Sequence, residues 1–142
     1  MKILVINGPN LDMLGIREKG IYGAKSLTDL ENDLRDEAKI HDISIEFFQS
    51  NHEGYIIEKI HDAREGYDGI IINPGAFGHY SYAILDAIKS IETPTVEVHI
   101  SNVHKREEFR KNTVLTPGCV GVVCGLGLYS YKAALLYFIE QR

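Results

Sequence analysis

The sequence predicts an α/β fold in which a sheet of parallel strands is doubly wound, with helices on both of its faces. Two observations lead to this prediction. Short apolar runs alternate with stretches of helical periodicity five times along the 142 residues. No repeat, linker or low-complexity stretch interrupts that alternation. The length suits one core, so we expect residues 1–142 to form a single domain of three layers, helix, sheet and helix.

Five segments have the patterns of strands: residues 3–6, 43–47, 69–73, 95–100 and 120–123. Segments 3–6 and 69–73 are continuously apolar, which is typical of strands covered on both faces. Apolar and polar residues alternate in 43–47, which predicts a half-exposed strand. With five parallel strands in this arrangement, the expected fold class is flavodoxin-like.

The intervals between the strands have the spacing of helices. Ser26 can cap the first long helix, because Asp29 three residues later approximates a capping box. That helix is expected to run from Leu27 to near His41. The other helices are expected between residues 51 and 66, from 83 to 91, from 105 to 111 and, after the last strand, through 139.

The connection after the first strand, residues 7–23, is long and is expected to be irregular. Its many apolar side chains argue against disorder, so we interpret it as a lid. Near its far end lie Arg17 and Tyr22. A guanidinium beside a phenol lowers a pKa of ~10 by roughly 1–3 units, which would make Tyr22 a base for a carbon-bound proton. The alternative is that Tyr22 packs the loop and Arg17 is a solvated charge.

Composition restricts the partners and the compartment. The net charge of −5, without a basic run, argues against non-specific nucleic-acid binding. The only two cysteines, Cys119 and Cys124, indicate a reducing compartment. Both are expected on one strand with opposite orientations, so they should not share a metal. The N-terminal apolar run is too short for a signal sequence or a membrane span, so a cytoplasmic protein is expected.

In doubly wound folds, ligands bind at the carboxyl ends of the strands. At the end of the fourth strand, alternation places Glu97, His99 and Ser101 on one side. Glu97 could orient and charge His99 as a general acid, and the backbone N–H groups of Ile100 and Ser101 could bind an anion. The alternative is a capping Ser101 and a buried, hydrogen-bonded His99.

The end of the third strand contributes Asn73 and, six residues later, His79. The Asn73 amide suits hydroxyl groups, although it could be an ordinary turn residue. Asp86 lies about 10 Å further along the next helix, too far to share a small ligand with His79 in one subunit. It is either a solvated acid or part of a neighbouring subunit's site. Arg106 and Arg110 could supply positive charge there or could be solvated.

Several other ligand classes fit less well. Residues 125–130 resemble a dinucleotide-binding fingerprint, but they follow the last strand and lack its third glycine. The sequence contains no P-loop, His-Glu-x-x-His or Gly-x-Ser-x-Gly motif. The first loop has no Ser or Thr before Ser26, which weakens a flavin-phosphate site. An acidic receiver pocket would need a carboxylate where this chain has Asn73.

Ordered blocks of sequence resemble type II 3-dehydroquinate dehydratase. The blocks are Asn-Gly-Pro-Asn-Leu (7–11), Gly-Ile-Arg-Glu (15–18), Ile-Tyr-Gly (21–23), Gln-Ser-Asn-His-Glu-Gly (49–54), Asn-Pro-Gly-Ala-Phe (73–77), His-Tyr-Ser (79–81), His-Ile-Ser-Asn (99–102) and Arg-Glu-Glu-Phe-Arg (106–110). They cover essentially the whole chain. The resemblance implies an anti elimination of water from 3-dehydroquinate through an enolate to give 3-dehydroshikimate, a shikimate-pathway step of aromatic amino acid biosynthesis. It also implies no cofactor or metal, and assembly as a dodecamer made of trimers.

The resemblance assigns roles to residues by motif. Tyr22 would be the base, and Arg17 the cation that ionises it and stabilises the transition state. Asn10 would stabilise the enolate through a water. His99, oriented by Glu97, would protonate the departing hydroxyl. Substrate-binding roles fall to Asn73, His79, Arg110 and the backbone of Ile100 and Ser101, while Asp86 would reach a neighbouring subunit's site.

The sequence departs from the family pattern at Lys19, where proline is usual, and at Gly78, where threonine is usual. Lys19 would loosen the lid or add positive charge. Gly78 removes a hydroxyl beside His79 and would leave that ring less firmly oriented. The alternative from another functional class is a non-catalytic flavodoxin-like module that keeps the loop to bind a ligand.

Overall fold

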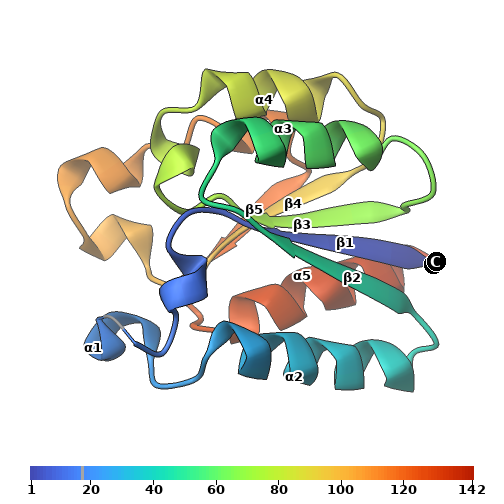
Figure 1. Cartoon of the computed structure of the whole chain (residues 1–142), viewed down its shortest axis with the longest axis horizontal. Helices are drawn as coiled ribbons and strands as arrows, with labels where there is room; N and C mark the ends of the chain where they lie inside the picture. Colours follow the sequence, from blue (N-terminus) through green and yellow to red (C-terminus); the bar gives the residue numbers. More distant parts are fainter. Residues whose placement is uncertain (17) are drawn as a thin grey trace.

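The computed structural model describes residues 1–16 and 18–142; Arg17 and the side chain of Tyr22 lie outside the described part. At its centre is a five-stranded sheet of order β2-β1-β3-β4-β5, in which each neighbouring pair is parallel (Figure 1). The strands are β1 (Lys2–Asn7), β2 (Ser44–Gln49), β3 (Gly69–Asn73), β4 (Thr95–His99) and β5 (Gly121–Cys124). The predicted flavodoxin-like, doubly wound α/β fold is confirmed.

Four longer helices form the two outer layers: α2 (Leu27–Ile40), α3 (Glu53–Asp62), α4 (Tyr82–Lys89) and α5 (Tyr129–Glu140). In Figure 1, α2 and α5 lie on one face of the sheet and α3 and α4 on the other. Among the described residues, none of the helices is both long and apolar enough to cross a membrane.

The alternation of β1 divides the core between these layers. Ile3 and Val5 pack in the cluster that contains buried residues of α2 and α5, whereas Leu4 and Ile6 pack with α3 and α4. All four are fully buried, and burial of each such side chain contributes roughly 1.5–3 kcal/mol relative to exposure. The edge strand β2 is only half-buried, as its alternating sequence predicted.

Short helical turns occupy the remaining connections. They are η1 (Leu11–Met13) and α1 (Lys19–Tyr22) after β1, η2 (Gly75–His79) after β3, η3 (Val103–Lys105) and η4 (Glu108–Lys111) after β4, and η5 (Thr116–Gly118) before β5. Those that follow β1, β3 and β4 gather at the carboxyl ends of the strands, on the left in Figure 1. The sequence predicted the site at these strand ends.

The predicted cap of the first long helix is present. The Ser26 hydroxyl accepts a hydrogen bond from the Asp29 N–H at 3.1 Å, and the Asp29 carboxylate accepts one from the Ser26 N–H at 2.8 Å. These two bonds satisfy backbone donors that the first turn would otherwise leave unpaired. The hydrogen bonds from Ser26 also lower the pKa of Asp29.

Two connections differ from the sequence-based prediction. Segment 7–23 is not irregular throughout, because Leu11 and Leu14 are buried against the α2 side of the core and hold the chain in a turn. Segment 105–111 is not one helix. It is divided between η3 and η4, because Arg106 has an extended backbone with φ −106° and ψ −163°.

The placement of the two cysteines on one strand was wrong. Cys124 ends β5, but Cys119 lies before it, because the turn η5, with Pro117 near its start, delays the strand until Gly121. Both thiols are free. Burial, together with the nearby charge of Glu97, raises the pKa of Cys119 to about 12, so this thiol remains neutral.

The first loop begins at Gly8, where its backbone contacts the backbone that follows β3. The Gly8 N–H donates to the Asn73 carbonyl at 2.7 Å. A Cβ atom on Gly8 would lie 2.4 Å from the carbonyl oxygen of Pro74, closer than real Cβ atoms come. Only glycine therefore fits here, and the contact ties the end of β1 to the end of β3.

Replacing Gly8 with Ala should force the loop away from β3. We expect the free energy of unfolding to fall by roughly 1–3 kcal/mol, as for other overpacked sites, measured by urea denaturation. Gly54→Ala in α3 is the matched control, because its Cβ would meet no atom within 4 Å. Alanine suits a helix, so the control should match the wild type or gain up to about 1 kcal/mol. A Gly8→Ala protein as stable as the wild type would contradict the close contact.

Candidate active site

A pocket opens at the carboxyl ends of β1, β3 and β4. The residues that line it are Pro9, Asn10, Leu11, Leu14, Asn73, Gly75, Ala76, His79, His99, Ile100, Ser101, Val103, Arg106 and Arg110. Two arginines and two histidines belong to this wall, and in the described part of the chain no acidic residue does. Because of the two arginines, the pocket is locally positive in a protein of net charge −5, which suits an anionic ligand.

Glu97 and His99 form a buried pair on one side of β4. His99 Nε2 lies 2.7 Å from Glu97 Oε1, and the two side chains are 7% and 0% exposed. The pairing predicted from strand alternation is confirmed. Because the carboxylate holds Nε2, the ring nitrogen left for a ligand is Nδ1, which has no hydrogen-bond partner among the described residues.

The second oxygen of Glu97 is paired as well. Thr116 donates its hydroxyl proton to Oε2 at 2.6 Å, and the hydroxyl of Thr113 contacts that of Thr116. A buried carboxylate is costly unless its oxygens find donors. Thr116 and His99 together supply them. Neither threonine is recognisable as part of the site from the sequence, because a contact between residues 97 and 116 leaves no local pattern.

His79 lies beside His99, with ring centroids 5.8 Å apart and planes inclined by 23°. Its Nδ1 is 2.9 Å from the carbonyl oxygen of Asn112, so Nδ1 carries the proton of the neutral ring and donates to that oxygen. Burial lowers the pKa of His79; the Asn112 carbonyl opposes this, while His99 and Arg110 add to it. The neutral ring therefore offers Nε2 as an acceptor.

The glycine at position 78 does not leave His79 without an anchor. The Asn112 carbonyl fixes the ring, and Ser81 caps α4 by accepting from the Ile84 N–H at 3.1 Å. A Cβ on Gly78 would lie 2.6 Å from the Pro74 ring and 3.5 Å from His99. Glycine thus lets this turn pack closely against its neighbours.

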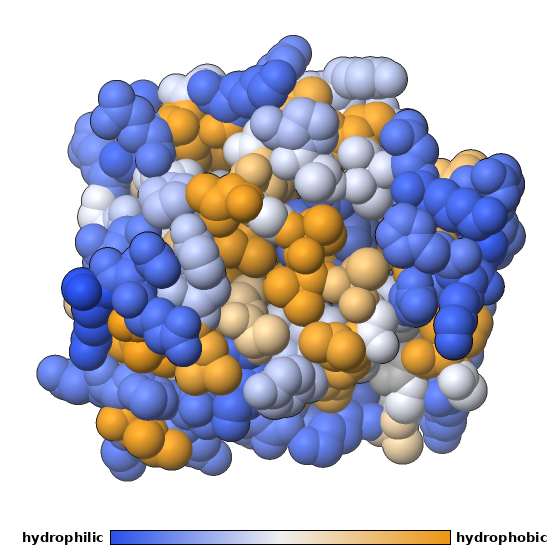
Figure 2. All heavy atoms as spheres, turned by 180° about the vertical axis from the view of Figure 1, so that it is seen from behind, coloured by the Kyte–Doolittle hydropathy of each residue, from blue (hydrophilic) through white to orange (hydrophobic). Residues whose placement is uncertain are grey.

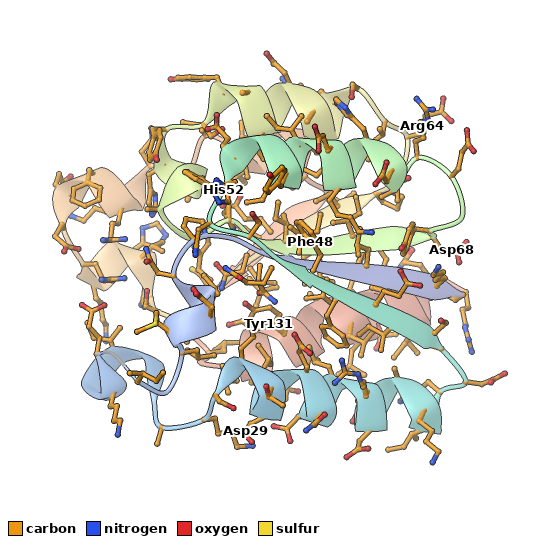
Figure 3. All side chains as sticks on the ribbon, in the orientation of Figure 1. Asp29, Phe48, His52, Arg64, Asp68 and Tyr131 are labelled. Atoms are coloured by element: carbon orange, nitrogen blue, oxygen red, sulfur yellow. The ribbon has the colours of Figure 1, made fainter. Side chains whose placement is uncertain are left out.

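Asn73 belongs to a buried network that joins β1, β3 and α5. Its Nδ2 donates to the Tyr131 hydroxyl at 2.8 Å, and that hydroxyl donates to Asn7 Oδ1 at 2.6 Å. Asn73 Oδ1 accepts from the Gly75 N–H at 3.1 Å. Tyr131 is fully buried between α5 and the sheet (Figure 3), and burial raises its pKa. The network fixes the Asn73 amide at the pocket wall.

The first loop is held by the segment after β2. Asn10 has a left-handed backbone with φ 67°, and its N–H donates to Asn51 Oδ1 at 2.9 Å. Gln49 Nε2 donates to the Gly8 carbonyl at 3.2 Å and to Asn51 Oδ1 at 3.3 Å. The block at 49–54 carried no role in the sequence analysis. Here it positions the backbone at Asn10.

Of the two arginines of the pocket, Arg106 lies at the break between η3 and η4, and Arg110 lies within η4. Arg106 Nη1 is 3.4 Å from Ser101 Oγ, which places a cation beside the backbone of Ile100 and Ser101. Arg110 donates from Nε to Glu107 at 2.8 Å, which partly offsets its charge. Asn102, rather than Ser101, caps η3. The capping alternative for Ser101 was therefore wrong.

Residues 1–139 match the sequence profile of the family described as dehydroquinase class II. The chain belongs to the class II dehydroquinases. A 3-dehydroquinate dehydratase of Bacillus pumilus (strain SAFR-032) is 59% identical over 138 residues, which are 97% of this chain and 94% of that protein. One from Bacillus cereus (strain AH187) is 54% identical, covering 99% and 96%. The crystal structure of type II dehydroquinase from Butyrivibrio crossotus DSM 2876 superposes with a TM-score of 0.95 at 54% identity, covering 97% of both chains.

The structure brings most residues predicted for this dehydroquinase site to one pocket. Those that line it are Asn10, Asn73, His79, His99, Ile100, Ser101 and Arg110. Glu97 lies behind His99, and Asp86 is exposed on α4 away from the lining. Arg17 and the Tyr22 side chain fall outside the described residues, so their pairing stays a prediction. The described residues contain no cluster of three His, Cys, Asp or Glu side chains that could hold a metal.

The lowered pKa of His79 gives this dehydroquinase a predictable pH response. Because the unfolded chain binds the proton more readily, His79 contributes stability above the ordinary histidine pKa of about 6.5. That contribution is lost as the pH falls through the lower pKa of the folded state. When the pH is lowered from 7.5 to 5.0, the free energy of unfolding of the wild type, measured by urea denaturation, should fall more than that of His79→Gln. A difference that does not change with pH would contradict the assignment.

Proposed function

We propose that this class II dehydroquinase removes water from 3-dehydroquinate by an anti elimination through an enolate, giving 3-dehydroshikimate. The activity itself, that of a hydro-lyase of the shikimate pathway, follows from family membership. The observation that carries the mechanism is the buried Glu97–His99 pair at the wall of a locally positive pocket. Its geometry suits an acid that acts on a bound anion.

The acid is His99. With Nε2 held by Glu97, a charged ring has its second proton on Nδ1, the nitrogen free for the substrate. It gives that proton to the departing hydroxyl as the carbon–oxygen bond breaks, and water leaves. Glu97 holds the ring in this orientation, and its second oxygen accepts a hydrogen bond from Thr116.

The base is Tyr22, ionised by Arg17. The phenolate takes a proton from the carbon next to the ketone, and the electron pair moves to the carbonyl oxygen as an enolate. Asn10 stabilises that oxygen through a water. Family resemblance supports these roles, as does the order of elements along the chain, since α1 follows the loop whose residues Pro9, Asn10, Leu11 and Leu14 line the pocket. The reaction needs no cofactor or metal, so EDTA should leave it unchanged.

The other residues that line the pocket bind the substrate. The backbone N–H groups of Ile100 and Ser101 hold the carboxylate, with Arg106 beside them, and Arg110 adds a second positive charge to the pocket. Asn73 and the neutral ring of His79 face the substrate hydroxyls as donor and acceptor. A rigid set of such groups orients the carbon–hydrogen and carbon–oxygen bonds for elimination.

The working enzyme is a dodecamer of trimers in the cytoplasm, in which Asp86 reaches a neighbouring site. Asp86 is exposed on α4, as that role requires. The side of the molecule on which β5 forms the sheet edge has apolar surface across its middle (Figure 2). Val120, Val122, Leu126 and Tyr129 near this edge are 43–55% exposed. Such a surface favours association with further copies.

Replacing Tyr22 with Phe should abolish kcat while substrate binding persists, because only the hydroxyl is removed. Turnover is followed by the ultraviolet absorbance of the conjugated enone, and binding by calorimetry. Tyr55→Phe is the matched control, since Tyr55 is exposed on α3 and does not line the pocket. Near-normal turnover by Tyr22→Phe would refute the base. A wild-type protein that binds 3-dehydroquinate without producing the enone would instead be a binding module.

Replacing His99 with Ala should lower kcat by roughly 10²–10⁴-fold, the range for a lost general acid. The same absorbance assay measures it. His61→Ala, an exposed histidine of α3 outside the pocket, should behave like the wild type. A mild effect of His99→Ala would move the acid role to another group.

A further inference from the structure

We propose that Thr116 and Thr113 are positioning residues for catalysis, which act on His99 through Glu97. The inference rests on the proposed role of His99 as the acid. Neither threonine lines the pocket, so neither would touch the substrate. Their effect would be to fix the orientation of the carboxylate that orients the imidazole.

The number of protons on each group fixes the direction of the hydrogen bonds. Thr116 donates to Glu97 Oε2 at 2.6 Å, and a hydroxyl has only one proton to give. In the contact between the two threonines, Thr113 must therefore be the donor. Glu97, which as a carboxylate can only accept, then takes its second hydrogen bond from the Nε2–H of His99. Thr113 therefore donates to Thr116, and Thr116 donates to Glu97.

The hydrogen bond at Oε1 of Glu97 depends on the hydrogen bond at Oε2, because both oxygens belong to one carboxylate. The side chain is completely buried, and Thr116 is the described residue that pairs with Oε2. Without that hydroxyl, Oε2 would be a buried, unpaired oxygen, so the carboxylate would rotate towards another donor. Rotation would move Oε1 away from His99, and the ring would lose the partner that sets its tautomer.

The threonines sit on a segment that is itself firmly held. Between them, Val114 and Leu115 are buried in the core on the side of α3 and α4. The Val114 N–H donates to the Gly78 carbonyl at 2.8 Å. The hydroxyls therefore have a fixed position relative to β4, which positioning requires.

The first test replaces Thr116 with Val, which keeps the shape and removes the hydroxyl. We expect kcat to fall about 10-fold, equivalent to about 1.4 kcal/mol, while KM changes less than about 2-fold. Thr116→Ser keeps the donor and should restore kcat to within about 2-fold of the wild type. Thr95→Val is the matched control, because it removes a buried hydroxyl from the same strand as Glu97 and should leave kcat unchanged.

Thr113 acts only through Thr116, which a double-mutant cycle can test. Thr113→Val alone should lower kcat by about 2- to 3-fold. The double variant should be no slower than Thr116→Val, because the outer hydroxyl has nothing left to orient. Independent, multiplying losses would overturn the proposed order of the two residues.

Nitrogen-15 NMR of the histidine rings gives a readout that a purely structural role would not change. In the folded wild type, neutral His99 should carry its proton on Nε2; in Thr116→Val, the signal should shift towards a mixture of tautomers. Wild-type kcat and an unchanged His99 signal in Thr116→Val would overturn the inference. If His99→Ala were itself active, the assignment of His99 as the acid in the proposed function would fail instead. The inference on Thr116 would also be overturned if Thr116→Val did not fold and Thr116→Ser had a low kcat, because the hydroxyl would then not be the group that matters.

Discussion

The site depends on one buried carboxylate that has a donor for each of its oxygens. Glu97 lies in the interior of β4, where burial would be unfavourable for an unpaired charge. Hydrogen bonds from His99 to Oε1 and from Thr116 to Oε2 stabilise the carboxylate in this buried position. Pairing this buried charge therefore fixes the position of the His99 ring and leaves its Nδ1 as the nitrogen available to a ligand.

The sheet brings the other groups to this pair. In the order β2-β1-β3-β4-β5 the direction of winding reverses between β1 and β3, and the connections that follow these strands diverge to opposite faces. The register pairs Asn7 with Asn73, so the polar ends of both strands lie together. Gly8 then allows the first loop to pass close to Pro74 and to reach the pocket. Position in the sheet, rather than proximity in sequence, therefore assembles the wall.

Much of this could be predicted from the sequence, and what could not has physical reasons. Periodicity of 2 and 3.6 identified the strands and long helices, and alternation along β4 predicted the Glu97–His99 pair. The break at Arg106 was missed, because single extended residues within a polar segment give no periodic signal. The contact of Thr116 with Glu97 and the Asn7–Tyr131–Asn73 network were missed, because they join residues that only the folded chain brings together. The roles of Arg17 and Tyr22 came from family motifs and stay predictions.

The hydrogen bond between Asn7 and Tyr131 joins residues 124 positions apart, one in the first strand and the other in the last helix. A ribosome releases β1 long before it releases α5. Until α5 emerges and docks, Asn7 Oδ1 lacks the hydrogen bond from the Tyr131 hydroxyl. The Asn73 side chain then has only its hydrogen bond with Gly75. The nascent chain can thus build most of its sheet early, yet the finished binding surface must await the emergence of α5.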